Sequence, residues 1–209
     1  MTKTTSQSRG QAFTLEGLVA GLILLTALLF AMQAVVVTPG APGADVEPDI
    51  RQQAMDMLDI AEQEGALSEM VRYYNNDSNA TTFAGARDST VGYGSSVPPT
   101  RFGNLTAWTF RDRGKVVNVV IEYQRSSDPG NVSDEIGSRI ERLIYQGAPP
   151  EAAAVASTTV TLYSNQTLTG PEGDGVTLAE AHEQGFYPIP NVDPDGPLHN
   201  VVQVRVIVW

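Results

Sequence analysis

A run of 21 residues without a charge, Gly17–Val37, constrains this chain more than any other feature of its sequence. At 1.5 Å per residue the run forms a helix of about 32 Å, which matches a bilayer hydrocarbon core of about 30 Å. It is longer than the apolar region of a secretory signal, and no small-x-small cleavage site follows it. The sequence therefore predicts an uncleaved, single membrane span and excludes a simple cytosolic protein.

The charges on either side of this run predict its orientation. Lys3 and Arg9 precede it, whereas the first charges after it are acidic, at Asp45, Glu47 and Asp49. Because flanks rich in Lys and Arg stay in the cytoplasm, we expect the N-terminus inside and the larger C-terminal part outside the cell. Helix-breaking residues directly after the span predict a hinge over 39–47; they are Pro39, Gly40, Pro42 and Gly43.

The amino-acid composition excludes several kinds of function for the part of the chain after the apolar run. The chain has 24 acidic and 13 basic residues, a net charge of −11, which argues against nucleic acid as a partner because phosphate binding needs a concentrated basic surface. Without cysteine, the chain forms neither a disulfide framework nor a thiolate site. The chain has an excess of acidic residues and only two lysines, Lys3 and Lys115. This composition is typical of proteins from high-salt environments, where salt screens the repulsion between like charges.

Five N-x-[ST] sequons predict an extracellular and glycosylated surface. Their asparagines are Asn76, Asn79, Asn104, Asn131 and Asn165.

Two features distinguish the apolar run from a simple anchor. Gly17 with Gly21, and Ala27 with Ala31, form small-xxx-small pairs that let helix backbones approach closely, although Gly and Ala are also common in membrane helices generally. Glu16 stands at the edge of the run, where a carboxylate is costly unless it is paired or reaches interfacial water. These five residues are candidates for assembly with other helices.

The segment Arg9-Gly10-Gln11-Ala12-Phe13-Thr14-Leu15-Glu16-Gly17, followed at once by the apolar run, resembles the type III signal of type IV pilins and archaellins. In that family a prepilin peptidase cuts on the cytoplasmic side, usually after a glycine that follows a charged residue. Arg9 and Gly10 match this pattern and favour a cut between Gly10 and Gln11. Bacterial pilins have one more apolar residue before their glutamate and are cut directly before the phenylalanine, so the alternative cut precedes Phe13.

The rest of the chain is similar to accessory pilin-like proteins of halophilic archaea, an uncharacterised group. The resemblance implies a cytoplasmic leader over 1–10, a transmembrane and assembly helix over 11–38, and an extracellular domain over 48–209. It implies a structural subunit, and a minor one, of a type IV pilus-like surface filament. Its partners would be a prepilin peptidase and other pilin subunits, contacted through the N-terminal helix. In the family the glutamate pairs with the α-amine of a neighbouring subunit, a role that would fall to Glu16.

The first part of the outer domain has a helical pattern. Apolar residues from Asp49 to Tyr74 recur with a period close to 3.6, which predicts one or two amphipathic helices with a break at Gly65. The polar segment 75–97 is expected to be an exposed loop. A short helix that ends at Gly114 follows, and its stripe of large side chains is expected in the core: Phe102, Leu105, Trp108 and Phe110.

The second part has the pattern of strands over 115–123, 138–145, 156–163 and 201–209. Ile140 and Ile144 are expected on one face of the second strand. Short connections predict that the first three strands form an antiparallel meander, with helices on the apolar face. The expected fold is α+β, with a single N-terminal transmembrane helix followed by an extracellular domain of helices packed on a four-stranded antiparallel sheet. Segment 165–198, with a capping box at Thr177 and Glu180, is either a functional loop or surface decoration.

No catalytic, metal or cofactor motif is present, and no enzymatic activity is expected. His182 and His199 are interpreted as surface or packing residues. Residues 191–202 resemble only the start of a calcium loop, because Pro194 interrupts it and Val202 replaces the bidentate glutamate, so a plain turn is expected. Two hypotheses remain, a pilin-like subunit and a monomeric membrane-anchored glycoprotein that binds a ligand or surface, and processing at Gly10 discriminates between them.

Overall fold

The structure is a computed structural model that describes residues 16–27, 48–77, 82–125 and 138–209. The chain divides into two compact units, Met1–Ala41 and Pro42–Trp209. In the first unit residues 16–27 form an α-helix. Within the described ranges, no helix is both long and apolar enough to cross a membrane. The predicted span continues from this helix into 28–37, which lies outside the described residues.

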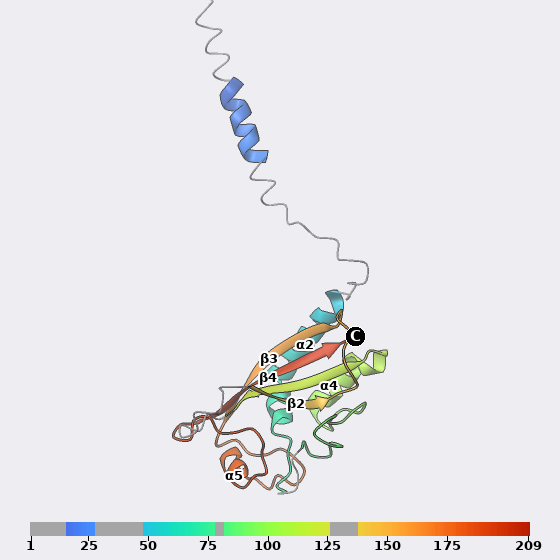
Figure 1. The fold of residues 1–209 in the computed structure, drawn as a ribbon, viewed down its shortest axis with the longest axis vertical. Coiled ribbons are helices and arrows are strands. Elements are labelled where there is room, and N and C mark those ends of the chain that lie inside the picture. The colour runs from blue at the N-terminus through green and yellow to red at the C-terminus, as the bar shows by residue number, and fades with distance from the viewer. Residues whose placement is uncertain (1–15, 28–47, 78–81, 126–137) are drawn as a thin grey trace, which may run out of the picture. The chain divides into compact units, whose positions relative to one another are not determined.

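The second unit is α+β, as predicted, with helices packed on a four-stranded antiparallel sheet (Figure 1). Its helices are α2 (Pro48–Gln63), α3 (Ala66–Val71), α4 (Arg101–Thr109), the 3₁₀ turn η1 (Arg111–Arg113) and α5 (Leu178–Glu183). Its strands are β1 (Val117–Gln124), β2 (Ser138–Ile144), β3 (Ala154–Tyr163) and β4 (Leu198–Val208).

The predicted helix break at Gly65 and the predicted capping box are confirmed, and the structure adds a cap at Thr100. Gly65 has φ +72° and separates α2 from α3, because only glycine adopts this left-handed conformation without strain. Thr100 caps α4 by accepting a hydrogen bond from the Gly103 amide at 3.3 Å. Thr177 and Glu180 form the expected capping box of α5.

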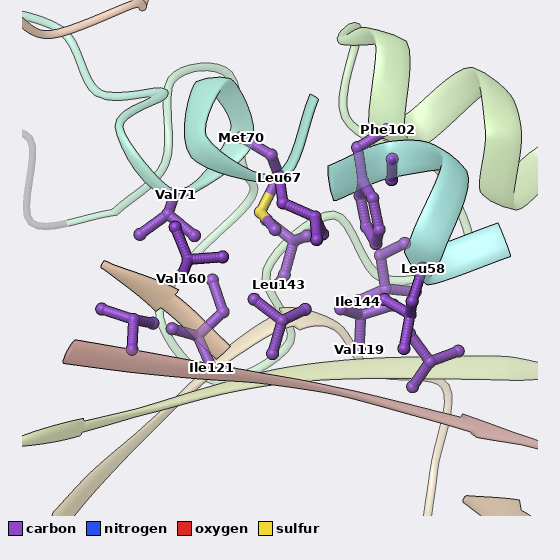
Figure 2. Packing of buried hydrophobic residues seen from close by; sticks show 14 of the residues in the cluster. Leu58, Leu67, Met70, Val71, Phe102, Val119, Ile121, Leu143, Ile144 and Val160 are labelled. Carbon is purple, nitrogen blue, oxygen red and sulfur yellow. The ribbon is translucent and has the colours of Figure 1, made fainter. Parts of the chain in front are cut away.

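The core lies between the helices and one face of the sheet. Figure 2 shows Leu58, Leu67 and Met70 pointing from the helices towards the side chains of the strands. Along β4 each second residue from Val202 to Val208 is buried, as the alternation predicts. Trp108 is an exception to the predicted stripe of α4, because it is 67% exposed while Phe102 and Phe110 are buried.

The predicted meander is wrong. The strand order is β2-β1-β4-β3, so β3 pairs with β4 and not with β2. The valine-rich β4 takes a central place between β1 and β3, where both of its edges are hydrogen bonded. The charged strand β2 lies at an edge, where the side chain of Arg139 reaches water.

The alternation expected in β2 is also wrong. The β1–β2 register shifts between Val119 and Val120, which pair with Ile144 and Arg142 respectively, so Leu143 is an extra residue in β2. A bulge of this kind reverses the facing of the residues on one side of it. As a result Leu143 and Ile144 are both buried, Ile140 is exposed, and the carboxylate residue Glu141 faces the core.

Two segments expected at the surface contribute to the core instead. In the segment 75–97 Phe83 and Tyr93 are buried, and the Phe83 ring lies 4.6 Å from that of Tyr74. In the segment 165–198 Leu178, Tyr187 and Ile189 are buried in the same cluster. The second segment is therefore part of the packed domain rather than decoration of its surface.

Candidate functional site

The helix 16–27 exposes apolar side chains on all sides. Its large residues have exposed fractions between 48% and 71%, at Leu18, Val19, Leu22, Ile23, Leu24 and Leu25. Glu16 is its one charged residue and Thr26 its one hydroxyl residue. The Thr26 hydroxyl donates to the Leu22 carbonyl at 2.7 Å, so it needs no water. A helix that is apolar all round is typical of a membrane span or of the buried core of a protein.

Three of the small candidate assembly residues lie on this helix, namely Gly17, Gly21 and Ala27. A Cβ added to Gly17 or Gly21 would meet nothing within 4 Å, so packing within the chain does not require glycine there. At about 100° per residue, Glu16 and Ala27 lie within about 20° of each other around the helix axis. The two glycines form a second stripe, about a third of a turn away. A close approach by another helix would use either stripe.

Several predicted site residues lie outside the described residues. They are the processing residues Arg9, Gly10 and Gln11, the assembly residue Ala31, and the sequon residues Asn79 and Asn131.

The remaining sequons differ in their surroundings. Asn104 is exposed on α4, but the hydroxyl of its sequon residue Thr106 is buried and donates to the Phe102 carbonyl at 2.9 Å. Asn165 is exposed in the turn that follows β3. Asn76 is half-buried, and its Oδ1 is buried without a hydrogen-bond partner. Among the three sequon asparagines that the structure describes, only Asn165 therefore combines an exposed side chain with a position outside regular structure.

We expect peptide mapping of the protein from its native host to find a glycan on Asn165 and little on Asn104. A transferase must engage the sequon hydroxyl, and in folded α4 the Thr106 hydroxyl is hydrogen bonded inside the core. Substitution Thr167→Ala should lower the intact mass by one glycan, because it removes the Asn165 sequon. Full occupancy of Asn104 would show that modification precedes folding of α4.

A buried polar pair in the outer domain was not anticipated from the sequence. The Tyr74 hydroxyl donates to Glu141 Oε2 at 2.8 Å, and both residues are buried. Burial raises the pKa of Glu141, while the hydrogen bond from Tyr74 and the charge of Arg139 act against this rise. Burial also raises the pKa of Tyr74 well above its ordinary value. Because neither group reaches solvent, the pair affects the stability of the domain rather than a dissolved substrate.

The Tyr187 ring lies between this pair and the histidines, with its centroid 5.2 Å from that of Tyr74 and 5.6 Å from that of His199. His199 is fully buried, and its Nε2 donates to the Ile189 carbonyl at 2.9 Å in the neutral tautomer that this contact favours. Burial lowers the pKa of His199, so the ring is neutral at pH 7. The His182 ring stands edge-on to it at 6.1 Å between centroids. His199 is thus a packing residue, one of the two roles predicted for it.

The predicted turn at 191–196 is present, since the Asp193 amide donates to Asn191 Oδ1 at 3.0 Å. In the described part of the chain, no three His, Asp or Glu side chains are grouped so that they could hold a metal ion.

Comparison with known proteins gives one match. The model of a family of unknown function (DUF7288) matches residues 9–208, which is nearly the whole chain. No curated protein and no solved structure matches the chain.

Proposed function

The chain belongs to the DUF7288 family, and we propose that it is a structural subunit, and a minor one, of a type IV pilus-like surface filament. Its N-terminal helix anchors it in the membrane before assembly and packs against the helices of other pilin subunits afterwards. The outer domain then lies on the extracellular side and carries the glycans. The observation that carries this proposal is the helix 16–27, whose apolar residues are exposed on all sides.

The length of the uncharged run supports the membrane part of the proposal. The described helix 16–27 accounts for about 18 Å, and the uncharged run reaches about 32 Å at Val37. Lys3 and Arg9 on one side and acidic residues on the other favour a cytoplasmic N-terminus.

Glu16 supports the assembly part. A carboxylate that begins an apolar helix is stable in a bundle only when a positive group meets it. Cleavage after Gly10 would supply such a group, because the new α-amine of Gln11 has a pKa near 8 and is largely protonated at pH 7. Glu16 lies five residues further on, which is too far round the helix for a good contact with its own terminus, so the partner would be the terminus of the next subunit. Pairing of this kind fixes the axial register of neighbouring helices.

The test is a comparison of Gly10→Val, Glu16→Ala and Glu16→Gln in the native host. Gly10→Val should abolish processing and assembly, because the peptidase requires a small residue before the cut. Glu16→Ala and Glu16→Gln should both be inserted and cleaved, yet reach filaments at least about tenfold less than wild type, because the charge is lost in both. The measurements are the N-terminal sequence of the mature chain and its amount in sheared filaments.

The same experiment discriminates the alternative of a monomeric membrane-anchored glycoprotein. A wild-type chain that still begins at Met1 and stays monomeric in the membrane would favour that alternative. Normal assembly of both Glu16 variants would remove the pairing role while leaving the anchor unaffected.

A further inference from the structure

The strand β3 forms one edge of the sheet, and its only hydrogen bond from a side chain to a helix in the described domain is that of the Thr158 hydroxyl, which donates to Glu62 Oε2 at 3.1 Å. In the spatial order β2-β1-β4-β3, β3 is the outermost of the described strands and pairs with β4 alone. Within the described residues, positions 155–162 make no backbone hydrogen bond outside the β3–β4 ladder. Every second amide and carbonyl along this edge is therefore open to a further strand.

The opposite edge is protected at the C-terminal end of β2. Gly92 bridges to Ile144, and the Tyr93 amide donates to the Leu143 carbonyl at 2.8 Å. The Arg142 guanidinium holds the same loop by donating to the Thr90 carbonyl at 3.1 Å. The bulge at Leu143 and the charges of β2 are further features that discourage the addition of a strand.

Among the residues that the structure describes, the edge at β3 has no covering loop and no charge within the strand, and the register shift of its ladder lies at its end, between Leu162 and Tyr163. Its ten residues include no charge, no proline and no glycine, although the whole chain carries a net charge of −11. The side chains on its exposed face are small or β-branched around the middle of the strand, at Ser157, Thr159 and Thr161. Such a strand is well suited to pairing with another uncharged strand.

A hollow lies beside the same edge. It has a volume of about 240 Å³ and is lined by β3 from Thr159 to Thr161 and by residues of α2, α3 and their connection, including Glu62 and Ser68. The Ser68 hydroxyl is buried and has no hydrogen-bond partner. Buried hydroxyls are normally hydrogen bonded, so the Ser68 hydroxyl is available to a further polar group at this hollow.

We propose that β3 pairs antiparallel with β3 of a second copy of this chain, so that the two sheets continue into one another across a two-fold axis. A second copy fits because pairing of β3 with itself brings no charge opposite a like charge, whereas most other surfaces of so acidic a chain repel their copies. Threonine and serine side chains then face their counterparts, which is a favourable cross-strand combination.

The geometry also limits the assembly to two copies. A two-fold interface uses the same strand of both partners. Residues 88–93 cover the C-terminal end of β2, and the rest of that strand carries Arg139 and Arg142, so addition of a third copy is disfavoured there within the described domain. The proposal does not depend on the N-terminal helix, which brings copies together without favouring one sheet edge over the other.

The test uses single cysteines in the full-length, cysteine-free chain in its native membrane. Ser157→Cys, Thr159→Cys and Thr161→Cys report on β3, and Ile140→Cys, which is 57% exposed on β2, is the matched control at the opposite edge. Under mild oxidation we expect at least one β3 cysteine to form a disulfide-linked species at least tenfold more than Ile140→Cys. Its intact mass should be twice that of the chain, with no ladder of higher species.

A charge on the edge gives a second readout. Thr159→Lys should reduce cross-linking through the best β3 cysteine at least fivefold, because it places two lysines near the two-fold axis. Ile140→Lys should leave the cross-linking unchanged. Equal cross-linking at both edges, a linked species that contains a different protein, or insensitivity to Thr159→Lys would each overturn the proposal.

Discussion

Replacement of Gly92 by alanine is expected to destabilise the outer domain by about 3 to 5 kcal/mol. Gly92 has φ +60°, a left-handed conformation that costs a residue with a Cβ about 1–2 kcal/mol. An added Cβ would also lie 2.1 Å from the Leu143 carbonyl oxygen, which is backbone and cannot rotate away. The loop 88–93 must therefore move off β2 and lose the contacts that it makes with Leu143 and Ile144.

Gly94→Ala is the matched control. Gly94 has nearly the same conformation, with φ +61°, but the nearest atoms to an added Cβ belong to the Arg87 side chain at 3.7 Å or more. We expect it to cost about 1–2 kcal/mol, which is the conformational part alone. Chemical denaturation of both variants measures the difference, and hydrogen exchange at Leu143 and Ile144 locates it. Equal costs for the two variants would mean that the loop yields to the added methyl group without loss.

The sequence predicted the parts of this fold that depend on local patterns. Gly65, the Thr177–Glu180 capping box and the alternation of β4 each involve residues within one element or one turn, and each is confirmed. The class of the domain follows from these elements, because helices and strands with one apolar face must pack on one another.

Strand order and the β2 bulge could not be read from these patterns. β4 enters the sheet between β1 and β3 from a distance of about 40 residues or more in sequence, and no short-range signal specifies that position. The bulge at Leu143 reverses the facing of Ile140 and Glu141, so strict alternation predicted the wrong residue for the core. The valine content of β4 and the charges of β2 were the only available indications of a central and an edge strand.

The polar pair at the centre of the domain was missed for the same reason. Tyr74 and Glu141 are 67 residues apart, and Glu141 faces the core only because of the bulge. The candidate assembly residues of the helix, in contrast, are recognisable from local spacing and charge alone, and their role stays a prediction.

The pair leads to the second large expected effect, a loss of stability in Tyr74→Phe that depends on pH. Burial raises the pKa of Glu141 in the folded state above its value in the unfolded chain. The stability that Glu141 gives to the folded domain is therefore fully present below the pKa of the unfolded chain, near 4.3. This stability is lost as the pH rises through the higher pKa of the folded state. The Tyr74 hydroxyl reduces that loss because it donates to the ionised carboxylate.

Without this donor the buried carboxylate is harder to ionise. Tyr74→Phe should therefore cost about 2–3 kcal/mol at pH 7 and about 1 kcal/mol at pH 4, where the carboxyl is protonated in the folded state and mostly protonated in the unfolded state. Tyr187→Phe is the control, because its hydroxyl is equally buried but donates to the Val71 carbonyl at 3.2 Å, which does not titrate. Its cost should be the same at both pH values.

The double variant Tyr74→Phe/Glu141→Gln separates the charge from the packing. Glutamine has the size of glutamate but does not ionise, so in this background the hydroxyl should matter equally at pH 4 and pH 7. Thermal or chemical unfolding of the four combinations at both pH values measures the coupling between the two residues. A Tyr74→Phe cost that is the same at pH 4 and pH 7 in the presence of Glu141 would contradict the assignment, since it would mean that the carboxyl does not titrate between these values or that another group compensates its charge.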